Sequence, residues 1–194
     1  IDCRASGTTM RFLAACAALV RGRVVLDGVA RMRERPIQDL ADALTSLGVS
    51  ARTVAGCPPI TIQGGRLRGG RVAVDASKSS QFLSALLMVA PLAESEVEIV
   101  SGKITSRPYV DVTLSVMNAF GISVELLGND SFRIAGGQRY RTRSYAIEPD
   151  ATAETLRASV RFGVDIWHRS HGTLPLADGS TTAGSAELMA GITD

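Results

Sequence analysis

The clearest pattern along the chain is an alternation between long apolar stretches and short β-branched runs. Residues 10–20 and 79–92 are rich in Ala, Leu and Met and carry few charges, which predicts helices buried on most sides. Residues 24–26 (VVL) and 97–100 (VEIV) each precede a glycine two residues later. These runs predict short strands that end in turns.

Two further helices are predicted between a proline and a glycine. Pro36 and Pro108 suit the first helical position, because the fixed φ of proline is helical and its missing N–H is not needed there. Gly48 and Gly121 suit the left-handed residue that ends a helix. Helical spacing places one apolar face on each helix, formed by Leu40, Ala43, Leu44 and Leu47 in the first and by Val112, Val116, Met117 and Phe120 in the second.

These elements recur along the chain, because residues 6–65 can be superposed on residues 77–137. Both copies close on Gly-Gly, and each predicts two strands after its second helix. Those strands are residues 51–54 and 60–63, then 123–126 and 131–134, with 129–130 (ND) as a tight turn. The superposition places 10–15 (MRFLAA) on 80–85 (SQFLSA) and 35–39 (RPIQD) on 107–111 (RPYVD).

The repeat predicts the fold class. With residues 72–74 as the strand that enters the second copy, we expect an α/β (α+β) fold of repeated βαβαββ units. About two complete copies, at 6–65 and 72–137, are followed by part of a third that begins at 145–147 and 150–152.

The composition gives no indication of a nucleic-acid or membrane partner. The net charge of the 194 residues is only +2, which does not indicate a nucleic-acid partner. No apolar run approaches the roughly 20 residues of a membrane helix, so we expect no membrane partner. The cysteines Cys3, Cys16 and Cys57 form no disulfide framework, which favours a reducing, cytoplasmic setting. The start lacks a methionine and a leader, so we expect the chain to begin inside a longer one.

Four stretches place hydroxyl or basic side chains where helices begin: 5–11 (ASGTTMR), 31–36 (RMRERP), 77–81 (SKSSQ) and 105–109 (TSRPY). Free N–H groups and the helix dipole favour anions at such positions. Taken alone, the first stretch is an ordinary N-cap and the second a solvated charge cluster. Because the repeat makes the four entrances equivalent, we predict that they share one face and bind a ligand with phosphate and carboxylate groups.

No metal or cofactor is expected. Trp167, His168 and His171 lie close together in the sequence, but they do not form a recognisable ligand spacing.

The four stretches resemble, in order and spacing, the signature motifs of 5-enolpyruvylshikimate-3-phosphate (EPSP) synthases: residues 6–11, 32–37, 79–88 and 106–111. The resemblance covers about residues 2–153 and implies the inside-out α/β barrel of enolpyruvyl transferases. We therefore expect an EPSP synthase-like domain over residues 1–153. Residues 154–194 depart from the family pattern, and we expect a divergent, weakly ordered tail there.

The resemblance implies a 3-phosphoshikimate 1-carboxyvinyltransferase, which transfers the enolpyruvyl group of phosphoenolpyruvate to shikimate 3-phosphate in aromatic amino-acid biosynthesis. It places shikimate 3-phosphate against Ser79, Ser80, Gln81, Ser106 and Tyr109. It places phosphoenolpyruvate, or the competing herbicide glyphosate, against Gly7, Thr8, Arg35 and Gln81, with Arg11 behind them. Phe12 replaces the proline that is common in herbicide-sensitive enzymes, which leaves the response to glyphosate open.

The resemblance also implies an incomplete active site. The lysine-serine motif of the family, its acid and base, and its second domain have no counterpart in the sequence, so we assign no catalytic residue. We expect weak ligand binding, little turnover, and a complementary domain or chain that completes the site.

Two alternatives stay open. One is a non-catalytic phosphosugar-binding or split-enzyme complementing module. The other is a UDP-N-acetylglucosamine enolpyruvyl transferase, whose usual cysteine is missing from residues 29–36.

Overall fold

A computed structural model describes residues 1–128 and 130–146 of the chain. The elements below belong to the compact unit Ile1–Arg141. Part of the predicted turn at 129–130, most of the predicted third copy and the predicted tail at 154–194 lie outside the described residues.

The four predicted helices are present, and glycine ends two of them as expected. Gly48 (φ +91°) follows the second helix and Gly121 (φ +84°) the fourth. The helices are α1 (Gly7–Ala17), α2 (Gln38–Ser46), α3 (Ser80–Val89) and α4 (Arg107–Ala119), with 3₁₀ turns η1 (Ala30–Glu34) and η2 (Ala90–Leu92).

The prediction for proline is confirmed in one copy and wrong in the other. Pro108 lies in the first turn of α4, but α2 begins two residues after Pro36. The intervening Ile37 has non-helical backbone angles (φ −138°, ψ 2°), and its N–H donates to the Gly56 carbonyl at 2.9 Å. This hydrogen bond to the turn between two strands delays the start of α2.

Two antiparallel-rich sheets repeat the same topology, one in each copy. The first has the order β1-β3-β2 and the second β4-β5-β7-β6, where β5, β7 and β6 correspond to β1, β3 and β2. The strands are β1 (Gly22–Leu26), β2 (Ser50–Val54), β3 (Cys57–Gly64), β4 (Gly70–Ala73), β5 (Val97–Val100), β6 (Glu125–Leu126) and β7 (Ser131–Ile134).

The first residues of the chain take the place of β4 in the first copy. Strand β4 pairs in parallel with β5, and Asp2 forms a parallel bridge with Asp27 at the end of β1. The predicted repeat is therefore confirmed at the level of strand pairing.

The helix caps correct one detail of the superposition. Ser6 accepts a hydrogen bond from the Thr9 N–H (3.1 Å) and Ser79 accepts one from the Gln81 N–H (3.3 Å), and each is the N-cap of its helix. Ser6 therefore corresponds to Ser79 and Thr8 to Gln81. The predicted match of residues 10–15 with 80–85 is wrong by three residues, because caps rather than the shared Phe-Leu pair set the helix starts.

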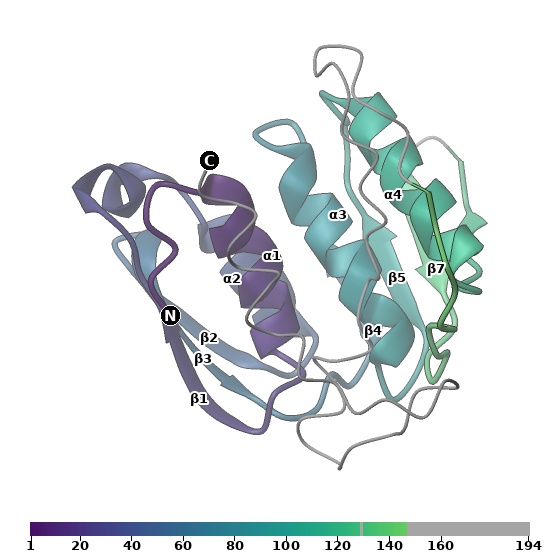
Figure 1. Cartoon of the computed structure of the whole chain (residues 1–194), viewed down its shortest axis with the longest axis horizontal. Coiled ribbons are helices and arrows are strands. Elements are labelled where there is room, and N and C mark those ends of the chain that lie inside the picture. Colours follow the sequence, from purple (N-terminus) through teal and green to yellow (C-terminus); the bar gives the residue numbers. More distant parts are fainter. Residues whose placement is uncertain (129, 147–194) are drawn as a thin grey trace. The chain divides into compact units, whose positions relative to one another are not determined.

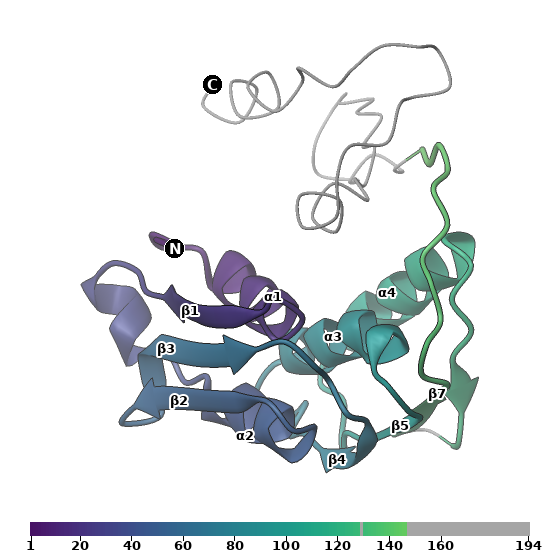
Figure 2. The same cartoon turned by 90° about the horizontal axis from the view of Figure 1, so that it is seen from below.

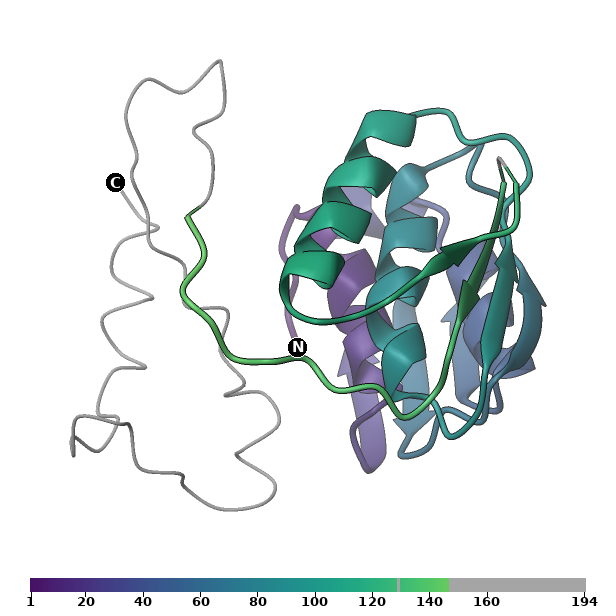
Figure 3. The same ribbon diagram turned by 90° about the vertical axis from the view of Figure 1, so that its right-hand side faces the viewer.

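The helices α1, α3 and α4 lie side by side, with α3 in the middle (Figures 1 and 3). Figure 2 shows the strands of the two sheets on one face of the layer that these three helices form. Alternate residues of β3 and β7, an inner strand of each sheet, enter the core. Ile60 and Ile62 of β3 and Phe132 and Ile134 of β7 are fully buried. The two copies thus share one hydrophobic core. In the described part of the chain, no helix has the length and apolarity to cross a bilayer.

A short segment after each copy returns to the end of that copy's second helix. The Arg68 N–H donates to the Leu47 carbonyl (2.9 Å), and the Arg141 N–H donates to the Phe120 carbonyl (2.8 Å). The first segment also accepts hydrogen bonds from the second copy, because the Glu94 N–H donates to the Leu67 carbonyl at 2.8 Å. Residues 66–68 (RLR) and 139–141 (RYR) therefore have the same role at the ends of successive copies.

Candidate anion-binding site at the helix N-termini

The starts of α1 and α3 are joined by side-chain hydrogen bonds. Gln81 Nε2 donates to Thr8 Oγ1 at 3.0 Å, and Arg11 Nη1 donates to Gln81 Oε1 at 2.6 Å. Because both ends of the Gln81 amide are engaged, its orientation is fixed. The structure thus brings together residues separated by 70 and 73 positions in the sequence.

Arg11 carries a positive charge that no carboxylate in residues 1–128 or 130–146 balances. Its guanidinium lies 4.9 Å from the centre of the Phe82 ring and 3.4 Å from Ser79 Oγ, and no hydrogen-bond partner of Arg11 in the described chain is acidic. Burial, and then the charge of Arg35, lower the pKa of Arg11. Arginine stays protonated nevertheless, so the site keeps an excess of positive charge.

Arg35 supplies the second guanidinium, and Gly7 makes room for it. A Cβ atom on Gly7 would lie 2.6 Å from Arg35 Nη1 and 3.7 Å from Arg11 Nη1. The buried Met32 supports Arg35 from the other side, with Sδ 3.8 Å from Nη1. A hollow lined by Ala5, Arg31, Met32 and Arg35 opens beside this arrangement. The absence of a side chain at Gly7 therefore lets Arg35 reach the first turn of α1.

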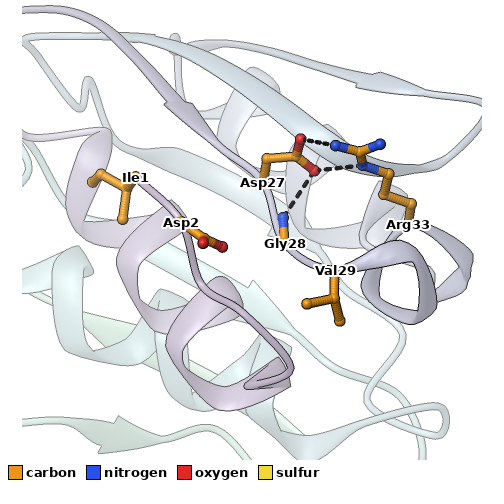
Figure 4. Close-up of a pocket in the computed structure, with 6 residues that line it drawn as sticks. All are labelled: Ile1, Asp2, Asp27, Gly28, Val29 and Arg33. Carbon is orange, nitrogen blue, oxygen red and sulfur yellow. Dashed lines mark hydrogen bonds and ion pairs between the residues drawn. The ribbon is translucent and has the colours of Figure 1, made fainter.

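Arg33, only two residues from Arg35, is neutralised elsewhere. Its Nε and Nη2 donate to Asp27 at 2.9 and 2.6 Å, and this pairing lowers the pKa of Asp27. Figure 4 shows the pair in a separate hollow, together with Gly28 and the first residues of the chain. The arginines of the predicted cluster thus have different surroundings, and Arg35 is the one that faces α1.

The start of α3 presents the Ser79 hydroxyl group beside the Arg11 guanidinium. Ser79 Oγ accepts from the Gln81 N–H and from Arg11, so its own proton remains available for donation to a ligand. Ser80 is the first residue of α3 and is 8% exposed.

The start of α4 adjoins the loop that precedes α3, but its side chains form no hydrogen bond with Gln81 among the described residues. Thr105 Oγ1 donates to the Ser77 carbonyl at 2.7 Å, and Figure 1 shows α1, α3 and α4 beginning at the same end. Ser106 is the N-cap of α4 without a side-chain capping bond, and Tyr109 is 71% exposed. Among the described residues, no hydrogen bond joins Ser106 or Tyr109 to Gln81.

The start of α2 is connected to this loop by an ion pair that the sequence did not reveal. Lys78 Nζ lies 3.1 Å from Asp39 Oδ2 and 3.7 Å from Asp75 Oδ2, and the pairing with Asp39 raises the pKa of Lys78. The only signal in the sequence was the position of Asp39 in the repeated Arg-Pro-x-x-Asp motif.

The chemistry of this cluster suits an anion rather than a cation. Two guanidiniums, hydroxyl groups, an amide and helix N-termini all offer hydrogen-bond donors. Within residues 1–128 and 130–146, no group of three or more His, Cys, Asp or Glu side chains has the arrangement of a metal site.

The sequence and fold of this chain are similar to those of EPSP synthases. The sequence model of EPSP synthase (3-phosphoshikimate 1-carboxyvinyltransferase) matches residues 1–159. The 3-phosphoshikimate 1-carboxyvinyltransferase of Methanoculleus marisnigri is 50% identical over 163 residues, which cover 82% of this chain and 38% of the relative. That of Actinobacillus pleuropneumoniae serotype 3 is 44% identical over 155 residues, which cover 76% of this chain and 36% of the relative.

A solved structure agrees with the sequence comparison. The EPSP synthase of Acinetobacter baumannii superposes with a TM-score of 0.64 at 28% identity, over 72% of this chain and 31% of that one. The chain spans little more than a third of the length of the curated relatives it matches. The match over residues 1–159 covers most of the chain, and the chain therefore belongs to the EPSP synthase family.

Proposed function

We propose that the chain supplies one wall of the site in which the enolpyruvyl group of phosphoenolpyruvate is transferred to shikimate 3-phosphate. The observation that carries this proposal is the meeting of Arg11 and Arg35 at Gly7, where neither guanidinium has a carboxylate partner among the described residues. Two like charges repel each other there. A phosphate or carboxylate group between them would remove that repulsion and gain charge-assisted hydrogen bonds.

The two substrates would occupy neighbouring parts of this wall. Phosphoenolpyruvate, or glyphosate in its place, lies against Arg35, Gly7 and Thr8, and Gln81 bridges both halves. Arg11 orients the Gln81 amide through its 2.6 Å hydrogen bond. The 3-phosphate of shikimate 3-phosphate is held by the serine hydroxyl groups at the starts of α3 and α4, and the exposed Tyr109 side chain lines the shikimate ring. The serines concerned are Ser79, Ser80 and Ser106.

Anion-binding groups alone do not move protons. Transfer of the enolpyruvyl group releases phosphate and requires an acid and a base within hydrogen-bond reach of the reacting atoms. We therefore assign no catalytic residue to this wall. A complementary domain or second chain would supply those groups and exclude water when it closes over the ligands. We expect the complete reaction to take place in the cytoplasm.

Titration of the purified chain tests the proposal. Phosphoenolpyruvate and shikimate 3-phosphate are added separately and together, with and without the C-terminal domain of a related EPSP synthase, while amide NMR shifts and phosphate release are followed. We expect saturable shifts at the starts of α1 and α3, and turnover only after the domain is added. The absence of saturable shifts would contradict the proposal.

The same experiment separates the two alternatives. Saturable binding without turnover in any mixture would favour a non-catalytic phosphosugar-binding module. Tighter binding of UDP-N-acetylglucosamine than of shikimate 3-phosphate would favour the related transferase. The names of the relatives and the missing cysteine in residues 29–36 favour shikimate 3-phosphate.

Substitution of Gly7 by alanine tests the wall on the phosphoenolpyruvate side. The new methyl group would overlap Arg35 Nη1, since the Cβ position lies 2.6 Å from that atom. We expect binding of phosphoenolpyruvate to weaken by about tenfold, or ~1.4 kcal/mol. The midpoint of thermal unfolding should change little, because the obstructing group is the end of a flexible side chain. NMR titration and a melting curve measure the two effects, and a large loss of stability with unchanged affinity would contradict the expectation.

A further inference from the structure

The repeated Arg-Pro-x-x-Asp motif is used differently in the two copies. In the second copy, Arg107 Nε donates to Asp111 Oδ1 at 2.7 Å, so the arginine is paired with the aspartate four residues later. The equivalent residues of the first copy are Arg35 and Asp39. No hydrogen bond or ion pair joins these two in the described part of the chain.

In the first copy, Asp39 forms an ion pair with Lys78 instead of with Arg35. The Lys78 Nζ atom lies 3.1 and 3.4 Å from the two carboxylate oxygens of Asp39. The lysine comes from the loop before α3 and is also 3.7 Å from Asp75. Asp75 is held in turn by the backbone N–H of Ser77 at 2.9 Å. The second copy thus provides the cation for the carboxylate at the start of α2.

We propose that Lys78 is a positioning residue that keeps Arg35 available for an anionic ligand. This inference rests on the proposed function, in which Arg35 binds phosphoenolpyruvate. A carboxylate near a guanidinium competes with a ligand for the same donors, because both offer two oxygens to the planar fork of arginine. By holding Asp39, Lys78 removes the competitor four residues later in the chain, which is the position that binds the arginine in the second copy. Arg35 instead lies against Gly7 and Met32.

The arrangement of the second copy shows what the competing state looks like. There the aspartate pairs with its own arginine at the helix start, and no lysine among the described residues forms an ion pair with it. Asp39 has the matching position in the first turn of α2, and its side chain is only 26% exposed. A partly buried carboxylate that loses Lys78 needs another cation, and Arg35 is the equivalent one.

The full 194-residue chain and its variants can be titrated with phosphoenolpyruvate and followed by NMR. In Lys78→Gln we expect the dissociation constant to rise about fivefold, a size typical of a partly exposed charge pair. Adding Asp39→Asn to this variant should restore the affinity to within about twofold of wild type, because the competing carboxylate is gone. Lys78→Arg should behave like wild type.

Arg66→Gln provides a charge-matched control. Arg66 pairs with Glu94 at 3.1 Å, and Glu94 follows η2 at the other end of α3. This variant loses the same unit of positive charge as Lys78→Gln. Its affinity for phosphoenolpyruvate should stay within about twofold of wild type, since exposed charges far apart are screened.

The outcomes separate this inference from the proposed function. If wild type shows no saturable binding, both are overturned. If wild type binds and Lys78→Gln binds equally well, the inference alone is wrong. The inference is also wrong if Asp39→Asn fails to restore the affinity of Lys78→Gln, since Lys78 would then contact the ligand itself.

Discussion

Replacing Gly64 by alanine is expected to lower the free energy of unfolding by about 3 kcal/mol. The new Cβ atom would collide with the Ala17 carbonyl oxygen and lie 2.6 Å from that of Val20. Both oxygens belong to the backbone, one at the last residue of α1 and one in the turn that follows, so neither can move aside as a side chain could. Urea unfolding followed by circular dichroism measures the loss.

The neighbouring Gly65 is a matched control for Gly64. Its φ of +143° makes alanine unfavourable, but the nearest atom would be 3.8 Å away, on Arg21. We expect Gly65→Ala to cost only about 1 kcal/mol, from backbone strain alone. Equal losses for the two variants would mean that the close approach of Gly64 to α1 does not determine its effect.

For ligand binding, Arg35→Ala should have the largest effect. Loss of a guanidinium that grips a phosphate or carboxylate with two hydrogen bonds costs about 2 kcal/mol, which corresponds to a roughly 30-fold weaker affinity for phosphoenolpyruvate. Stability should change little, because the side chain is exposed. NMR titration of the chain with phosphoenolpyruvate gives the affinity.

Arg33→Ala removes the same charge two residues away. Arg33 is bound to Asp27 by two hydrogen bonds and does not face α1, so we expect a change of about twofold or less in affinity. If the two arginine variants weakened binding equally, the effect would come from net charge, and the assignment of Arg35 to the ligand would be wrong.

The sequence was sufficient for the elements and their repetition because these depend on local features. Apolar spacing identified α3, and the glycines that end α2 and α4 have the positive φ angles that only glycine adopts easily. The pairing of β5 with β7 places Val97 opposite Ile134 and Ile99 opposite Phe132. This register follows from the alternation of apolar residues in both strands.

The remaining features depend on contacts between distant segments, which no local pattern encodes. The late start of α2 results from the hydrogen bond between Ile37 and Gly56. The orientation of Gln81 depends on Arg11, and the pairing of Asp39 depends on Lys78 from the other copy. The sequence placed the arginines and serines at helix entrances, and the family resemblance singled out Arg35, but no local pattern indicated that Arg33 pairs with Asp27.

The segment at residues 66–68 has a consequence for how the protein folds. It caps the last helix of the first copy through Arg68 and pairs with the second copy through Leu67. The boundary of cooperative unfolding therefore does not coincide with the boundary of the duplicated sequence. The segment after the first copy has partners in both copies, so neither copy forms all of its backbone hydrogen bonds in isolation. A duplication of this kind produces an interdependent pair rather than two autonomous modules.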